Sequence, residues 1–377
     1  PDASTHGEIY FHDIGDYLSS EEKLEKVSNY ACVAGIENWQ KITPDIHGDW
    51  LRQRDQSFGQ FIVLGDKKGD CPKLFDNFSL GVATGRDAWA YNSSRTKLEA
   101  NIGRMIDFYN EQLGSFDFAC GEASSKERKS RADKFIDANP QKISWNRNLL
   151  QDLVKGTKHR FSSGAICKSL YRPFTNQYLY FDRTMNAMVY QMPRLFPKTG
   201  AENLVIMTTA KGAKEFSFTI SSAIPDLNSM EAGAQCFPLY LYDEAARQAD
   251  EDEDDLFASE VDTESQRRNA ITDEALAHFQ MAYPGEQISK EDLFYYVYGI
   301  LHSQDYRERF ADNLSKELPR IPAVKRVADF WAFSKAGRAL ADLHLNYETV
   351  EPYLLTIEAK SKLTDADYRV EKMKFAK

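Results

Sequence analysis

The chain has 377 residues, of which 42% are apolar and 12% aromatic, so it can bury the cores of two or three compact units. Its formal net charge is −10, an unusual value for a protein that binds nucleic acid. Its apolar runs are too short to cross a bilayer, and its first residues contain neither a basic nor an apolar stretch. We therefore expect no membrane span and no signal peptide. The absence of an initiator methionine predicts that Pro1 lies inside a longer protein.

The five cysteines are widely spaced, and no two of them form a Cys-x-x-Cys pair. This spacing argues against a zinc ribbon and against a disulfide framework. We therefore expect a cytoplasmic protein whose cysteines are small buried side chains.

In the first third of the chain, the sequence predicts strands at 7–13 and 60–64 and helices at 21–30 and 96–113. Ser19 and Glu22 have the spacing of a capping box before the first of these helices. The second helix is amphipathic, because its apolar side chains recur at helical spacing on one face.

The middle of the chain is rich in strand candidates, which lie at 178–181, 187–190, 204–208, 216–221 and 237–242. In the fourth, Phe216, Phe218 and Ile220 alternate with polar residues, the pattern of a half-buried strand. After an acidic run, the chain becomes helical.

Thr272 can cap a helix over 273–283, and Ser289 with Asp292 can cap the next helix. The two prolines in 318–322 must interrupt helical structure, which then resumes over 323–345 with Gly337 as a weak point. The predicted fold class is α+β, a mixed-sheet lobe followed by a helical C-terminal lobe.

Several motifs that would indicate catalysis are missing. The chain contains no Gly-x-x-x-x-Gly-Lys-Ser/Thr phosphate loop, no Gly-x-Gly-x-x-Gly, no His-Glu-x-x-His and no Asp/Asn-Pro-Pro-Tyr/Phe loop. We therefore predict no catalytic residue, no metal site and no cofactor in this part of the protein. One alternative stays open, a metal-dependent nuclease that uses Asp45, Asp66 and Lys68, whose spacing permits two carboxylate ligands and a lysine beside the attacking water.

The charge is distributed very unevenly. Residues 243–264 contain eleven acids and one base, which equals the whole net charge, whereas residues 126–198 contain fifteen bases and five acids. The acidic run predicts a linker. The basic stretch can face phosphates, because association depends on the local electrostatic field.

Within the basic stretch, 155–194 interleaves cations and amides with aromatic residues. Arg and Lys can pair with phosphates or with guanine, while Asn and Gln can pair with adenine. Upstream, two glycines lie beside an Arg on a predicted tight loop at 81–92. The predicted DNA contacts are Arg86, Lys155, Lys158, Arg160, Lys168, Arg172, Asn176, Gln177, Arg183 and Arg194.

Seven short strings in this order resemble the C-terminal region of type ISP single-polypeptide restriction–modification enzymes. They are His12–Leu18, His47–Trp50, Gly81–Asn92, Ser169–Phe174, Cys236–Tyr240, Leu318–Pro322 and Leu343–Glu348. Members of that family carry a nuclease, a helicase-like translocase, a coupler, an adenine-N6 methyltransferase and a target-recognition domain.

The resemblance implies that residues 1–75 are the tail of the methyltransferase domain. It also implies that 76–242 and 269–377 are the mixed and helical parts of the target-recognition domain, joined by an acidic linker at 243–268. The implied function is sequence-specific recognition of double-stranded DNA, with upstream methyltransferase and helicase domains of the same polypeptide as partners. S-adenosylmethionine, ATP and Mg²⁺ would act in those other domains. The remaining alternative is a protein-interaction module that does not touch DNA.

Overall fold

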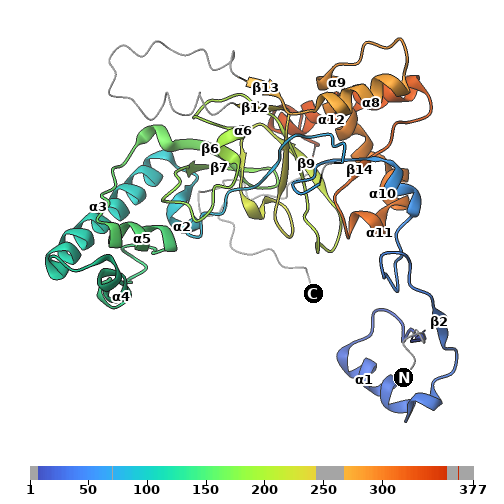
Figure 1. Ribbon diagram of the computed structural model, residues 1–377, viewed down its shortest axis with the longest axis horizontal. Coiled ribbons are helices and arrows are strands. Elements are labelled where there is room, and N and C mark those ends of the chain that lie inside the picture. The colour runs from blue at the N-terminus through green and yellow to red at the C-terminus, as the bar shows by residue number, and fades with distance from the viewer. Residues whose placement is uncertain (1–6, 70, 243–266, 355–363, 365–377) are drawn as a thin grey trace. The chain divides into compact units, whose positions relative to one another are not determined.

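The computed structural model describes residues 7–69, 71–242, 267–354 and 364 (Figure 1). A large unit ends at Leu345, and a short C-terminal unit begins at Asn346. In the short unit, the described structure is a single turn of 3-10 helix at Tyr347–Thr349, followed by coil up to residue 354. The acidic segment at 243–264 lies outside the described residues.

The helices of the large unit fall into an N-terminal helix, a group before the basic strands and a group after the acidic segment. They are α1 (Ser20–Asn29), α2 (Asp87–Ala90), α3 (Arg95–Cys120), α4 (Ser125–Phe135), α5 (Arg147–Lys155), α6 (Met192–Leu195), α8 (Asp273–Ala282), α9 (Lys290–His302), α10 (Gln304–Arg309), α11 (Ala311–Leu314) and α12 (Val327–Leu345).

Two four-stranded sheets form the centre of the large unit. The first has the order β10-β6-β7-β5 and is mixed, since β10 (Ile224–Pro225) is parallel to β6 (Ile166–Arg172), while β7 (Thr175–Tyr180) is antiparallel to both β6 and β5 (Tyr91–Asn92). The second is antiparallel, with β4 (Ser79–Leu80), β11 (Gln235–Pro238), β8 (Val205–Thr208) and β9 (Phe218–Ser221) in that order.

Three further strand pairs are antiparallel and tie distant parts of the chain together. They are β1 (Ile9–Phe11) with β2 (Gln40–Ile42), β12 (Tyr240–Tyr242) with β13 (Arg267–Asn269), and β14 (Arg320–Ile321) with β3 (Ile62–Val63).

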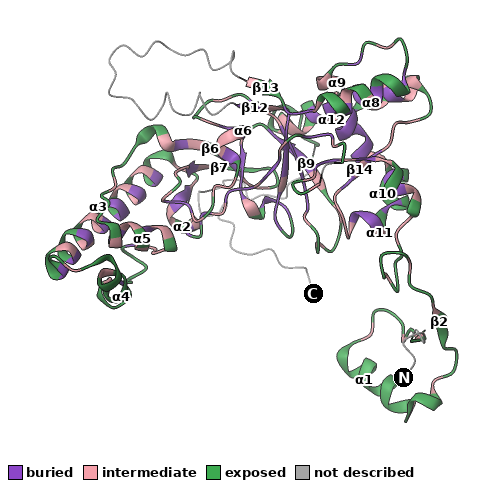
Figure 2. Cartoon of the chain, viewed as in Figure 1, coloured by how far each residue is buried: buried purple, intermediate pink, exposed green. Residues whose placement is uncertain are grey.

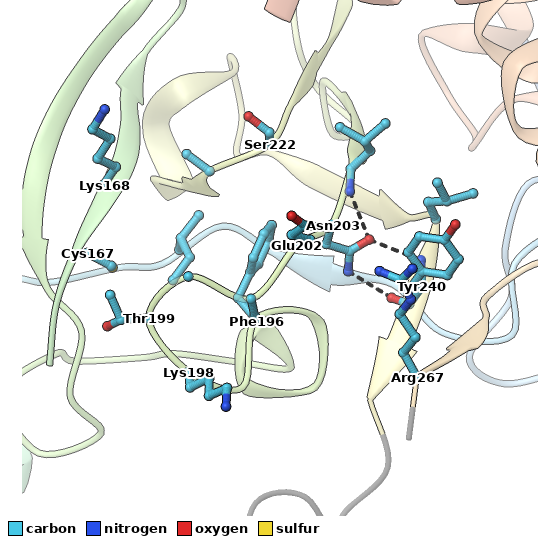
Figure 3. Close-up of a pocket in the computed structure, with 16 residues that line it drawn as sticks. Cys167, Lys168, Phe196, Lys198, Thr199, Glu202, Asn203, Ser222, Tyr240 and Arg267 are labelled. Carbon is cyan, nitrogen blue, oxygen red and sulfur yellow. Dashed lines mark hydrogen bonds between the residues drawn. The ribbon is translucent and has the colours of Figure 1, made fainter. Parts of the chain in front are cut away.

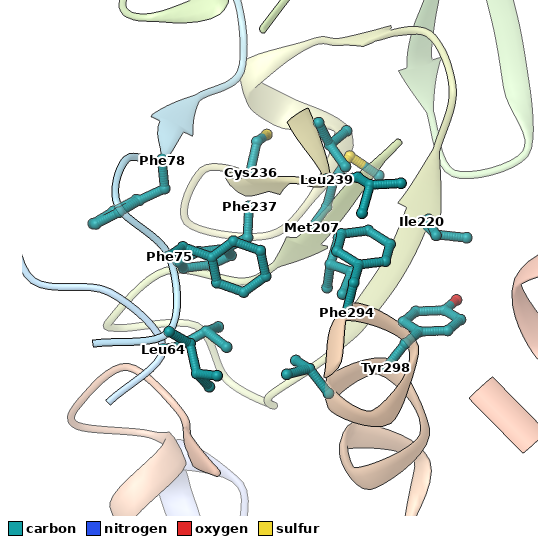
Figure 4. Packing of buried hydrophobic residues seen from close by; sticks show 14 of the residues in the cluster. Leu64, Phe75, Phe78, Met207, Ile220, Cys236, Phe237, Leu239, Phe294 and Tyr298 are labelled. Carbon is teal, nitrogen blue, oxygen red and sulfur yellow. The ribbon is translucent and has the colours of Figure 1, made fainter. Parts of the chain in front are cut away.

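The larger hydrophobic core joins the antiparallel sheet to the C-terminal helices. Phe237 of β11 stacks on Phe78, with ring centroids 4.9 Å apart, and lies against Phe75 at 5.4 Å (Figure 4). Phe294 of α9 in turn meets Phe75 edge to face. The helices after the acidic segment therefore share a core with the sheet before it.

A second, separate core lies among α3, α4 and α5. One face of α3 is buried along its whole length, from Leu98 to Cys120, and packs on Leu149 and Leu153 of α5. Ile166 and Tyr180, from β6 and β7, close this core and connect the helices to the mixed sheet.

The cap signals predicted helix starts well. Ser19 with Glu22 and Ser289 with Asp292 form capping boxes at α1 and α9, and Thr272 caps α8. The structure thus confirms the α+β class and the mixed sheet. It also confirms that helical structure is interrupted between Pro319 and Pro322, where β14 forms.

Four sequence predictions were wrong or incomplete. Cys32 and Cys71 are exposed, although the cysteines were expected to be buried. Residues 187–190 form no strand and make one isolated bridge, Ala83 with Met188. β9 is largely buried rather than half-buried, because α9 and α12 cover its outer face. The elements β6, α4 and α5 were missed.

The N-terminal stretch contributes nothing to either core. Among the described residues from 7 to 57, none is buried, and α1 is exposed on all sides (Figure 2). Its large apolar side chains, such as Tyr17, Leu24 and Trp50, are open to solvent. In the described part of the chain, no helix combines the length and apolar character that a membrane span needs.

Candidate nucleic-acid interface

The structure distributes the predicted DNA contacts over several surfaces. Lys155 ends α5, and Lys158 and Arg160 follow it in an exposed coil. Lys168 and Arg172 lie on β6, and Asn176 and Gln177 lie on β7, where they pair with Leu170 and Ser169 in the strand register. Arg183 is exposed in the loop after β7, and Arg194 is half-buried in α6. Arg86 is buried.

Arg86 lies out of reach of any nucleic acid in this structure. Its side chain is 4% exposed, and its Nη1 lies 4.0 Å from the sulfur atoms of Met105 and Met185. Its Nε and Nη2 have no hydrogen-bond partner among the described residues. Burial lowers the pKa of Arg86 to about 10, so the group still carries its charge at neutral pH.

Arg172 is engaged by acidic side chains instead of being free for phosphates. Its Nη1 donates to Oδ1 of Asp226 at 2.8 Å, its Nη2 lies 3.9 Å from Oδ2 of Asp87, and its guanidinium stacks 3.9 Å from the centre of the Tyr171 ring. Burial raises the pKa of Asp226, and the Arg172 charge opposes that shift. Arg172 therefore stabilises the join between β6 and the Asp226 turn.

A groove of about 700 Å³ beside α6 brings together cations that are distant in sequence (Figure 3). We call it the α6 groove. Its walls are β6, the loop at 196–204, the turn at 222–224 and the β12–β13 pair. Lys168, Lys198 and Arg267 line it, and the acid among its lining residues is Glu202.

The cations of the α6 groove are held in different ways. Lys168 and Lys198 are exposed, and their side chains make no ion pair with any described residue. Arg267 is half-buried, with its guanidinium 4.5 Å from the centre of the Tyr240 ring. An arginine stacked on an aromatic face keeps its hydrogen-bonding edge free for a carboxylate or phosphate.

One buried asparagine fixes the walls of the α6 groove (Figure 3). The Asn203 amide donates to the carbonyl oxygens of Leu195 and Tyr240 at 2.8 and 2.9 Å, and its Oδ1 accepts from the backbone nitrogens of Leu204 and Tyr240. These four bonds tie the end of α6 and the start of β12 to the residues that precede β8. The groove is therefore a preformed feature of the fold.

Sequence reasoning found Lys168 but missed Lys198 and Arg267. Lys198 closes the basic stretch without any distinguishing neighbour, and Arg267 lies beyond the acidic segment. Only the antiparallel pairing of β13 with β12 brings Arg267 to the groove. No local pattern encodes that pairing.

The structure gives no support to a nuclease centre built on Asp45 and Asp66. The Asp45 carboxylate accepts from the backbone nitrogens of His47 and Asp49, and that of Asp66 accepts from the backbone nitrogen of Lys68. Both side chains stabilise their own turns. Across the described ranges, no three His, Cys, Asp or Glu side chains gather as a metal site would require.

The fold and the groove define an α+β protein with a preformed cationic cleft. The model of the Type ISP C-terminal specificity domain matches residues 73–377, and the chain belongs to this family. No curated protein matches the chain.

Three similar solved structures are complexes with DNA. A nuclease-deletion mutant of the Type ISP restriction-modification enzyme LlaGI, bound to a DNA substrate mimic, is 32% identical with a TM-score of 0.75, covering 93% of this chain and 25% of that one. The DrdV–DNA complex is 30% identical with a TM-score of 0.75, and the match covers 96% of this chain and 33% of the DrdV chain. The ATP-dependent Type ISP restriction-modification enzyme LlaBIII bound to DNA is 32% identical with a TM-score of 0.72, covering 92% and 21%. The chain thus spans a third or less of each of these proteins.

Proposed function

We propose that this chain recognises the DNA target of a Type ISP restriction–modification enzyme and contacts duplex DNA through the α6 groove. The observation that carries the proposal is that Lys168, Lys198 and Arg267 all line one rigid cleft, in a family whose solved relatives are DNA complexes. Unpaired cations on a preformed surface are what phosphate binding requires, because each phosphate contact releases condensed counterions.

Methylation and ATP-dependent cleavage then belong to other domains of the same polypeptide, which would use S-adenosylmethionine, ATP and Mg²⁺. The enzyme would work in the cytoplasm, where cellular and incoming DNA meet. This division of labour is supported by the missing catalytic motifs and by the small share of each relative that the chain covers.

The groove assignment is tested by the double variant Lys198→Ala/Arg267→Ala of the 377-residue chain. If both side chains contact phosphates, affinity for every duplex should fall, and the slope of log affinity against log salt should become shallower by about two. Fluorescence anisotropy with labelled duplexes measures both quantities.

The charge-matched control is Lys325→Ala/Lys335→Ala, which removes two exposed lysines that make no ion pair with a described residue and line none of the clefts above. This control should keep the wild-type slope. Equal slopes for the two double variants would remove the groove from the interface.

We further propose that the N-terminal stretch of the chain, within the range 1–75, is the tail of the methyltransferase domain. Its exposed apolar residues and the absence of buried side chains at 7–57 indicate a surface that packs on another part of the polypeptide. The family match, which starts at residue 73, agrees with this boundary. A separately expressed upstream domain should bind the whole chain but not a version that begins at Gln56, and equal binding by both would contradict the assignment.

A further inference from the structure

A second cationic cleft lies between α4 and α5 and shares no lining residue with the α6 groove. Its volume is about 610 Å³, and Lys129, Arg147 and Lys155 line it, with Asp133 as the acid among the lining residues. We call it the α4–α5 cleft. All three cations are exposed.

The charges of this cleft are not neutralised within the protein. Lys129, Arg147 and Lys155 make no ion pair with any residue that the structure describes, and even Asp133, one helical turn from Lys129, lies beyond ion-pair distance. Neighbouring cations with no counter-charge repel one another, which disfavours their convergence unless an anion binds among them.

The helices that carry these cations are rigidly joined. Arg128 of α4 donates to the carbonyl oxygens of Val154 and Leu153 in α5, at 2.7 and 3.0 Å, and also pairs with Asp117 of α3. The Arg128 guanidinium lies over the Phe116 ring at 4.9 Å. One half-buried arginine thus fixes three helices, so the cleft exists before any ligand arrives.

Asn146, which also lines the cleft, has an unsatisfied donor. Its Oδ1 accepts from the backbone nitrogen of Leu149 and caps α5, which fixes the orientation of the amide. Its Nδ2 has no hydrogen-bond partner among the described residues. A buried donor without an acceptor is unfavourable, because the hydration it loses is not replaced, and a bound oxyanion would supply an acceptor.

We infer that the α4–α5 cleft is a second phosphate-binding site for duplex DNA, in which Lys129, Arg147 and Lys155 contact the sugar–phosphate backbone. This inference rests on the proposed DNA-recognition function and extends it to a separate part of the domain. The ligand is a phosphodiester. Two lysines and an arginine around an open cleft suit the repeated, singly charged phosphates of a nucleic-acid backbone better than one buried anion. Such contacts position the duplex and carry no sequence preference of their own.

The test is the triple variant Lys129→Ala/Arg147→Ala/Lys155→Ala of the full chain, titrated with labelled duplex DNA over a range of salt concentrations. The slope of log affinity against log salt should become shallower by about three, with equal losses for target and non-target duplexes. Because the three side chains are exposed and repel one another, the thermal melting temperature of the variant should not fall. If the alanine variant fails to fold, the corresponding glutamine variant provides the same test.

The matched control is Lys126→Ala/Arg131→Ala/Lys134→Ala, which removes the same charge from the other exposed positions of α4. A slope change in the cleft variant and not in the control supports the inference. Equal slope changes, or none in the cleft variant, overturn it. Wild-type binding that still responds to Lys198→Ala/Arg267→Ala would leave the proposed function standing, whereas no binding by the wild-type chain would defeat both.

Discussion

At the scale of single residues, Arg86 shows how a surface motif and a core position can look alike. Gly81 and Gly85 precede Arg86, which suggested a tight surface loop that presents the arginine. In the structure, Thr84 donates to Asp87 and closes the loop, while Arg86 turns inward between Met105 and Met185. The acid that follows Arg86 in sequence pairs with Arg172 instead.

Replacement of Arg86 by Met should therefore leave DNA binding intact. The unbranched apolar side chain fills a similar volume and removes a buried charge that lacks partners, so the free energy of unfolding should be unchanged or should rise by up to about 3 kcal/mol. Urea unfolding and duplex anisotropy measure the two effects. A variant that folds with wild-type stability but loses affinity for DNA would place Arg86 in the interface after all.

At the scale of elements, the contact between α9 and α12 depends on two glycines. A Cβ on Gly337 would lie 1.9 Å from the carbonyl oxygen of Tyr295, and one on Gly299 would lie 2.2 Å from that of Phe333. Neither neighbour is the flexible end of a side chain. Gly337 is thus a point of close backbone approach between two helices, and the sequence-based view of it as a weak point in α12 was incomplete.

Gly337→Ala should force α9 and α12 apart and lower the free energy of unfolding by about 3 kcal/mol or more. Gly103→Ala is the matched control, since Gly103 lies within α3 and an added Cβ there meets nothing within 4 Å. That control should gain about 0.5–1 kcal/mol from helix propensity alone. Chemical denaturation compares the two, and a loss below about 1 kcal/mol for Gly337→Ala would disprove the close approach.

The elements that the sequence predicted are those with local signals. The capping residues Ser19, Thr272 and Ser289 mark helix starts, because their side chains bond to the backbone of the next turn. Such a signal lies within a few residues and can be seen in the sequence. By contrast, α4 buries only Ala132 and shows almost no apolar stripe, so periodicity could not reveal it. β6 was hidden because charged residues at Lys168 and Arg172 interrupt its apolar pattern.

The candidate site was less predictable than the fold, because it is built from long-range pairings. Of its three groove cations, one was predicted, and the other two reach the groove through the loop after α6 and through β13. Likewise, Lys155 was predicted, but its partners Lys129 and Arg147 depended on how α4 packs against α5. Residue type alone cannot give such convergence.

At the scale of the whole molecule, the net charge is negative, whereas the charge around individual clefts is positive. The chain carries a formal charge of −10, yet its described surface contains two clefts, each lined by three cations and one acid. The bases of 126–198 line different clefts: Lys168 and Lys198 line the α6 groove, Lys155 lines the α4–α5 cleft, and Arg194 lines a smaller cleft with Lys67 and Lys73. The molecule thus offers phosphates separate anchoring points.

The most direct test of this account is the affinity of the unmodified chain for duplex DNA as a function of salt concentration. Six phosphate contacts, three from each cleft, predict that log affinity falls linearly with log salt with a slope of about −5. Binding that does not change with salt, or no binding even at the lowest salt concentration, would contradict the claim that an acidic chain grips DNA through these two clefts.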